Sequence, residues 1–352
     1  MLKNKTQEIE ELSIHKGISI CSMIGLHTII WWMSKGNDGF IIKNWDKYEF
    51  ILTPYVLFFG WLSLSFAFTS GFSFHLWIFN KSNFPNLFSI IKRVLFLFIV
   101  GWFLNPKSWY IFQFLSVSMA LSYLLIKYFC IEFIWIFTFL SPFGANILRY
   151  FHLPWEGSYL EAILIGDKNG LYFWPFFPWY FLFGCGILFR DIKLKVSKKS
   201  RNLMIKIFLI LSLSFLNIGE FFKIIMPTID LTHFWGTGIF QPNLFQFFSW
   251  SALIINSFIA VEFVSKFNFK KIFYAFKKIG EYSLIIYIIH YKFFVSYVFL
   301  YKNDDFSRLF ILILLQILFS IFIGVILDFF IKKVYMEKQI EKKKNAWQTS
   351  NI

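Results

Sequence analysis

A lysine and a histidine at helical spacing are the first residues of this chain whose types suggest chemistry. Lys16 and His27 stand eleven residues apart in the mostly apolar segment IHKGISICSMIGLHTIIWWM, residues 14–33. Eleven residues make about three helical turns, so both side chains fall nearly on one face, roughly 16 Å apart along the axis. An imidazole can accept a proton or act as a nucleophile near neutral pH. Because an ionisable group inside an apolar helix is costly, we expect His27 to face a cavity or a partner. A structural histidine bonded to a neighbouring helix is the alternative.

A second polar stripe lies late in the chain. Ser283, Tyr287 and His290 recur at positions i, i+4 and i+7, which places them on one face of a helix. This face would either line a substrate cavity or form a hydrogen-bonded seam with another helix. Two further histidines, His15 and His75, are expected near a membrane interface, where they would be solvated or interfacial.

The composition indicates a protein embedded in a lipid bilayer. Of the 352 residues, 57% are hydrophobic and 16% are charged, and the mean hydropathy is +0.60, a balance that ordinary soluble domains do not have. The net charge of +15 could suit nucleic acid, but the basic residues gather in short loops beside apolar segments, which membrane topology explains better. Cys21, Cys130 and Cys185 lie in apolar runs without metal-ligand spacing. We therefore expect neither a nucleic-acid partner nor a metal site.

The elements that must position these residues are helices long enough to cross a bilayer. We expect an all-α fold, a polytopic integral membrane bundle of about ten transmembrane helices. A loop at 141–170 is expected to serve as a lid or substrate-binding loop. The expected spans are 14–33, 48–69, 94–104, 109–126, a fifth that ends near 140, 171–189, a seventh that ends near 222, 244–264, 282–300 and 309–331.

Basic residues predict the orientation of these spans. Lysine and arginine cluster after the sixth, eighth and tenth spans, and the loops between these clusters are poor in basic residues. By the positive-inside rule both termini are then cytoplasmic. The chain divides into a cytoplasmic N-terminal segment (1–13), a multi-span domain (14–334) and a basic cytoplasmic tail (335–352). Lys16, Lys92 and Arg93 would meet at the cytoplasmic mouth, although the positive-inside rule alone also accounts for Lys92 and Arg93. Asp328, near the end of the last span, is expected to pair or to reach the interface.

Six short stretches, in order across nearly the whole chain, carry a resemblance to a known family. They are the pair Lys16 and His27, FTSGFS at 68–73, the Lys92-Arg93 pair, QFLS at 113–116, FFPWYFLFG at 176–184 and IGEYSLIIYIIH at 279–290. Together they resemble the membrane acyltransferase-3 superfamily and the related group around heparan-alpha-glucosaminide N-acetyltransferase. Two positions differ, since Ser13 stands where these families have an acidic residue and Lys16 stands where they have arginine.

The resemblance implies transfer of an acyl group, commonly acetyl, from a cytoplasmic acyl-CoA thioester to a hydroxyl or amine of a glycan or lipid. His27 would be the general base or would carry the acyl group itself. Lys16, Lys92 and Arg93 would hold the phosphates of CoA.

The same resemblance implies further site residues and a location. Ser70 and Gly71 could let the backbone approach the CoA arm, or could form a small-residue packing site between helices. The cytoplasmic (inner) membrane of a prokaryote is the expected location, and a homodimer is left open. The residues expected to contact the acceptor are Ser283, Tyr287, His290, Gln113 and Trp179.

Two other classes of function remain open. A transporter or flippase would also have many spans with polar groups inside them, but it would show paired halves with interrupted helices, and no convincing repeat is present in the sequence. A catalytically inert relative is favoured by the differences at Ser13 and Lys16, because lysine cannot make arginine's planar bidentate contact with phosphate.

Overall fold

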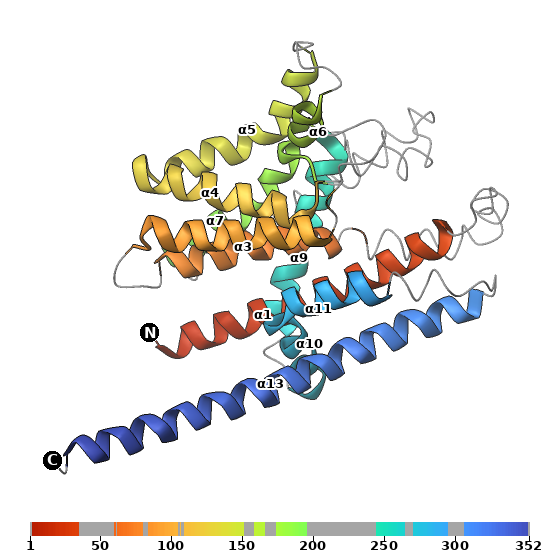
Figure 1. Cartoon of the computed structure of the whole chain (residues 1–352). Helices are drawn as coiled ribbons and strands as arrows, with labels where there is room; N and C mark the ends of the chain where they lie inside the picture. The colour runs from red at the N-terminus through yellow and green to blue at the C-terminus, as the bar shows by residue number, and fades with distance from the viewer. Residues whose placement is uncertain are drawn as a thin grey trace. The chain divides into compact units, whose positions relative to one another are not determined.

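Every regular element that the computed structural model describes is a helix (Figure 1). The described residues are 2–34, 60, 62–79, 84–104, 106, 109–150, 158–165, 174–195, 244–264, 270–294 and 306–350. The predicted all-α class is confirmed for this part of the chain. The predicted seventh span lies outside the described residues, as does most of the predicted second span.

Four described helices are long and apolar enough to cross a membrane. They are Leu62–Phe79, α3 (Leu87–Leu104), α4 (Ile111–Tyr128) and the part Phe310–Phe330 of α13 (Phe306–Ser350). This finding suggests a membrane protein, whereas the number of ten spans and the orientation of the termini stay predictions.

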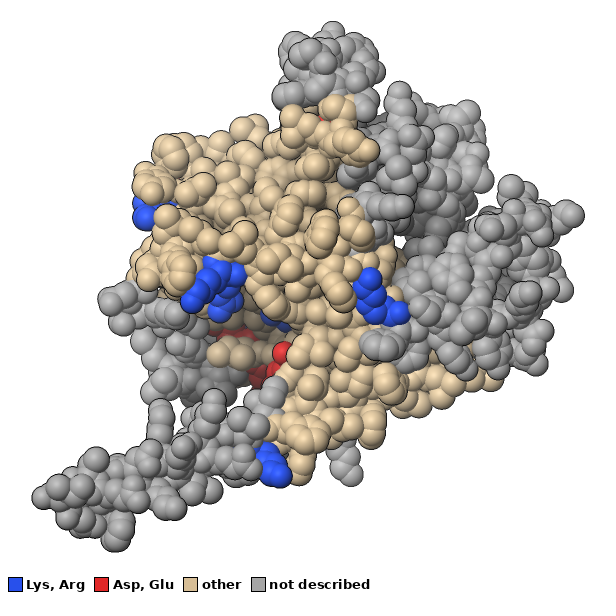
Figure 2. Space-filling view, in the orientation of Figure 1, with Lys and Arg blue, Asp and Glu red and all other residues tan. Residues whose placement is uncertain are grey.

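The surface of α3 has the character of a lipid-facing helix. Large apolar side chains that are each more than half exposed lie along it, namely Phe88, Leu95, Phe96, Ile99, Trp102 and Phe103. On the face that Figure 2 shows, most of the described surface carries neither basic nor acidic side chains. Contact with acyl chains would remove this apolar area from water, which a soluble monomer could not do.

The chain divides into two compact units. The first unit comprises Met1–Ser63 and Val261–Ile352, and the second comprises Leu64–Ala260. The helices of the first unit are α1 (Leu2–Ser34), α10 (Lys270–Glu281), α11 (Ser283–Ile289), the short π-helix η2 (His290–Phe294) and α13. The second unit holds most of Leu62–Phe79, α3, α4, α5 (Ile131–Tyr150), α6 (Tyr159–Ile165), α7 (Phe176–Lys195) and most of α9 (Leu244–Val264).

In the first unit, α1 and α10 pack backbone against backbone because two glycines carry no side chain into the contact. A Cβ atom on Gly280 would collide with the carbonyl oxygen of Ser13, and one on Gly17 would collide with that of Phe276. α13 contacts both helices. α1, α10 and α13 thus form a three-helix core for this unit.

In the second unit, α7 is the central partner. It packs on α5, and it approaches Leu62–Phe79 so closely that a Cβ atom on Gly186 would collide with the carbonyl oxygen of Phe68. Aromatic rings fill the space beside this contact, with Phe258 of α9 lying 5.6 Å from Phe68 and 5.6 Å from Phe189 between ring centroids.

The predicted loop at 141–170 is wrong for much of its length. α5 continues to Tyr150, and α6 begins at Tyr159. Pro142 lies inside α5 and lacks the N–H that would bond to the carbonyl of Thr138. The hydroxyl of Ser141 donates to that carbonyl instead, at 3.0 Å, so the helix continues past the proline.

Basic segments that were predicted as loops are also helical. Lys270, Lys271, Lys277 and Lys278 lie in α10, and the boundaries expected at residues 13 and 334 fall inside α1 and α13. Lysine and glutamate are good helix formers, so a polar run can mark where a helix leaves the apolar phase without ending it.

We expect Gly280→Ala to destabilise the first unit by about 1–3 kcal/mol, because the added Cβ atom meets the backbone of α1, which cannot move aside as a flexible side chain would. Thermal unfolding of the detergent-solubilised protein, followed by tryptophan fluorescence, measures the loss. Gly324→Ala is the matched control, since its Cβ atom would lie 3.4 Å from the nearest atoms, an ordinary contact. Equal stability of the two variants would contradict the close packing of α1 on α10.

Candidate functional site

His27 lies in a cluster of four aromatic rings within the first unit. Its imidazole stacks on that of His290, with ring centroids 5.7 Å apart and planes inclined by 10°. The rings of Tyr287 and Tyr291 meet His27 edge-on, at 6.0 Å and 6.3 Å, and stack on each other at 6.2 Å. We call these four residues the His27 cluster. It joins α1, near the start of the chain, to α11 and η2, near its end.

The late part of the cluster follows from helical spacing. Tyr287, His290 and Tyr291 occupy positions i, i+3 and i+4, which lie on one face. The helix changes from α to π geometry at His290, a widening of the turn that is frequent at functional sites. The structure therefore brings together three predicted residues, His27, Tyr287 and His290. Tyr291 was missed, although its spacing of four from Tyr287 could have included it.

Burial differs within the cluster. Tyr287 and His290 are 2% and 1% exposed, whereas His27 is only partly buried. Ser283, one turn before Tyr287 on α11, is buried as well. Of the two histidines, His27 is therefore the more exposed.

The cationic residues predicted for CoA binding belong to different units. Lys16 is partly buried on α1, three turns before His27. Lys92 and Arg93 are exposed on α3 of the second unit, where they lie over the rings of Phe88 at 4.3 Å and Trp77 at 4.2 Å. Their meeting with Lys16 stays a prediction.

Ser70 and Gly71 are buried in Leu62–Phe79, also in the second unit. The Ser70 hydroxyl donates to the carbonyl oxygen of Phe66 at 2.7 Å, within its own helix. A Cβ atom on Gly71 would collide with the carbonyl oxygen of Phe183 on α7. This geometry favours the helix-packing alternative for the two residues.

Gln113 and Trp179 are likewise buried in the second unit. The Gln113 side-chain oxygen accepts a hydrogen bond from the backbone N–H of Tyr110 at 3.0 Å, which caps the start of α4. Trp179 is 0% exposed on α7 and packs on Trp174, with ring centroids 5.3 Å apart. The residues predicted for the acceptor are therefore divided between the units, with Ser283, Tyr287 and His290 in the first and Gln113 and Trp179 in the second.

His15 and His75 are 0% and 1% exposed, so the prediction that they are solvated is wrong, while their position near a membrane interface stays a prediction. A guanidinium nitrogen of Arg190 on α7 donates to Nδ1 of His75 at 2.8 Å. Because a guanidinium cannot accept, Nδ1 carries no proton and the ring is neutral with its proton on Nε2. Nε2 faces the Asp191 carboxylate at 3.7 Å. The contacts among His75, Arg190 and Asp191 hold Leu62–Phe79 against α7. The only signal for them in the sequence is the charged pair Arg190-Asp191 near the end of an apolar helix.

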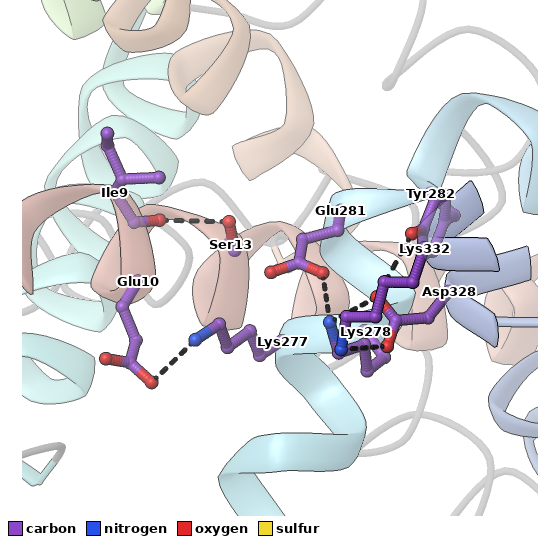
Figure 3. Close-up of polar contacts among 9 residues, drawn as sticks. All are labelled: Ile9, Glu10, Ser13, Lys277, Lys278, Glu281, Tyr282, Asp328 and Lys332. Atoms are coloured by element: carbon purple, nitrogen blue, oxygen red, sulfur yellow. Dashed lines mark hydrogen bonds and ion pairs between the residues drawn. The ribbon is translucent and has the colours of Figure 1, made fainter. Parts of the chain in front are cut away.

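An ionic network holds α10, and with it the start of α11, against α13 (Figure 3). The Lys278 ammonium donates to Asp328 at 2.8 Å and to Glu281 at 2.6 Å, and the Tyr282 hydroxyl donates to Asp328 at 3.3 Å. Lys332 also pairs with Asp328, at 2.8 Å. The prediction that Asp328 pairs is confirmed.

The charge of Lys278 is retained through the neutral range. Desolvation acts to lower the pKa of Lys278, but the hydrogen bonds and charges of Asp328 and Glu281 outweigh it and raise the pKa above its ordinary value. A lysine whose pKa is raised by folding stabilises the fold fully at any pH below its pKa in the unfolded chain. This contribution is lost only at strongly alkaline pH, as the pH rises through the pKa of the folded state.

The comparisons with known proteins add no family to this geometry. Searches of family models, of curated proteins and of solved structures found no match. Among the described residues no group of three or more histidine, cysteine, aspartate or glutamate side chains could hold a metal ion. Functional inference for this chain therefore depends on the His27 cluster and on the sequence pattern.

We expect Lys278→Met to destabilise the first unit by roughly 2 kcal/mol, because it leaves the buried Asp328 with one cation fewer. Lys277→Met, one residue earlier, removes only a pair with the half-exposed Glu10 at 3.0 Å and should cost less than about 1 kcal/mol. Urea unfolding of both variants in detergent tests the contrast, and a larger loss for Lys277→Met would refute it.

Proposed function

We propose that this chain is an integral membrane acyltransferase that moves an acyl group, acetyl in the simplest case, from acyl-CoA to a hydroxyl or amine of a glycan or lipid acceptor. The observation that carries the proposal is the stack of His27 on His290. These two residues come from the two stretches, 16–27 and 279–290, that resemble the membrane acyltransferase-3 superfamily and its relatives. A topology of ten transmembrane helices with both termini in the cytoplasm belongs to the same proposal, as does a location in the inner membrane of a prokaryote.

The reaction needs one group that can accept and return a proton. A nitrogen of the His27 imidazole takes the proton of the acceptor hydroxyl or amine while the acceptor oxygen or nitrogen attacks the thioester carbonyl carbon. The carbon–sulfur bond breaks, and the proton passes from His27 to the departing sulfur. The products are an ester or amide and the free thiol of CoA, so no oxidant or reductant is required.

The surroundings of His27 suit this role. His290 and the two tyrosines enclose it in aromatic surface, while its partial exposure leaves room for the reacting groups. Water excluded from such a site cannot compete well with the acceptor for the acyl group. In this proposal Lys16, roughly 16 Å along the same helix, binds the CoA diphosphate while the pantetheine arm reaches towards His27. Lys92 and Arg93 are carried over from the sequence pattern alone.

We expect His27→Ala to lower the rate of acetyl-CoA thioester cleavage by about 10²–10⁴-fold, the usual contribution of a general base. Lys16→Ala is expected to raise the KM for acetyl-CoA and to change the maximal rate less. Release of the CoA thiol by the full chain in detergent measures both effects.

Cys21→Ala is the matched control for these variants, because Cys21 is buried on the same helix and has no part in the proposed chemistry. A His27→Ala variant that unfolds like the wild type and retains full cleavage would refute the role of His27. A folded wild type that neither binds nor cleaves acetyl-CoA or palmitoyl-CoA would refute the acyltransferase and favour transport or an inert relative.

A further inference from the structure

Gln316 is a buried polar residue in an apolar stretch of α13. It is 1% exposed, whereas Leu314, Leu315 and Leu318 around it are each more than half exposed. Gln316 thus lies on the face of α13 that packs into the first unit. An amide without hydrogen bonds at such a position is costly, so each of its polar atoms calls for a partner.

One end of the amide is bonded to Thr28, the residue that follows His27. The two side chains lie 2.8 Å apart, and the Thr28 hydroxyl also lies 2.7 Å from the carbonyl oxygen of Ile24. A hydroxyl has one proton, and a backbone carbonyl can only accept. The Thr28 proton is therefore shared between two oxygens, and the side-chain oxygen of Gln316 accepts from Thr28. This orients the amide with its carbonyl oxygen on Thr28 and its NH₂ group at the opposite position.

The nitrogen of that NH₂ group, Nε2, is buried and has no hydrogen-bond partner among the residues that the structure describes. α13 contacts both α1 and η2, the segments that carry His27 and His290. Gln316 therefore offers a fixed hydrogen-bond donor in the helix group that builds the His27 cluster, anchored one residue from His27 itself.

We infer that Gln316 is a substrate-binding residue of this site and that its NH₂ group donates a hydrogen bond to a hydroxyl oxygen of the acceptor. The inference rests on the proposed function. An NH₂ group donates to one lone pair of a hydroxyl oxygen, which keeps its second lone pair for attack on the thioester. Gln316 does not titrate, so it orients the acceptor while His27 takes the proton.

The test uses the full chain in a sugar-free detergent, acetyl-CoA as donor and octyl glucoside as hydroxyl acceptor. We expect Gln316→Met, which has similar length and is apolar, to raise the KM for octyl glucoside about tenfold. The KM for acetyl-CoA should change less than about twofold. Thr28 keeps its bond to Ile24 in this variant, so folding should be preserved.

Two further variants separate binding from structure. Thr28→Val keeps Gln316 but removes its anchor, and it should raise the KM for octyl glucoside to a smaller extent. Ser320→Ala is the control, because the Ser320 hydroxyl, one turn along the buried face, donates to the backbone carbonyl of Gln316 and has no link to the acceptor. Both KM values should be unaffected in Ser320→Ala.

The outcomes distinguish this inference from the proposed function. An unchanged KM for octyl glucoside in folded Gln316→Met, or an equal rise in the KM for acetyl-CoA, overturns the role of Gln316 and leaves the acyltransferase intact. A wild type that cleaves acetyl-CoA but acetylates neither octyl glucoside nor octylamine also overturns it. A wild type that cleaves no thioester overturns the proposed function and the inference together.

Discussion

The backbone contact between α1 and α10 is the constraint on which the His27 cluster depends. A Cβ atom on Gly280 would lie 2.9 Å from the backbone nitrogen of Gly17, so the two glycines stand at one level. His27 is ten residues beyond Gly17, and His290 is ten residues beyond Gly280. α10 ends at Glu281 and α11 begins at Ser283, so a turn at Tyr282 lies between this contact and His290. The contact fixes the level from which both segments lead to the cluster, where the two imidazoles stack 5.7 Å apart.

Charge is separated from the cluster along these helices. Lys278, Glu281, Asp328 and Lys332 pair where α10 meets α13, around the turn that leads into α11. Beyond that turn the interior holds groups that can be neutral, the rings of the His27 cluster and the amide of Gln316. An ionic network can lie at the end of an apolar helix because some of its charged groups still contact water. A charged group deeper inside would lose all of its hydration, at a much larger cost in free energy. The network therefore secures the helices without placing permanent charge beside His27.

Sequence spacing could predict which residues share a helix face but not which face each one meets. The stripe of Tyr287 and His290 was predicted because it repeats at helical period, and Tyr291 was missed because the pattern was taken to end at His290. The burial of His75 was not predicted, because its partners Arg190 and Asp191 lie 115 residues and more along the chain. The loop expected from residue 141 was wrong at its start for a local reason, since the Ser141 hydroxyl replaces the hydrogen bond that Pro142 cannot make. Periodicity does not encode contacts between distant segments. It also does not show where a side chain replaces a backbone hydrogen bond within a helix.

The distribution of polarity in the first unit matches the charge changes of the proposed reaction. A thioester and a hydroxyl are neutral before the reaction, and an ester and a thiol are neutral after it, so charge develops at the centre only in passing. Such a reaction needs groups that are neutral at rest and can take a proton briefly, and His27 among aromatic rings is a group of that kind. The lasting charges of the donor are its phosphates, which lie at the far end of a long arm. Lys16, three turns from His27 on the same helix, is where the chain offers a lasting positive charge at that separation.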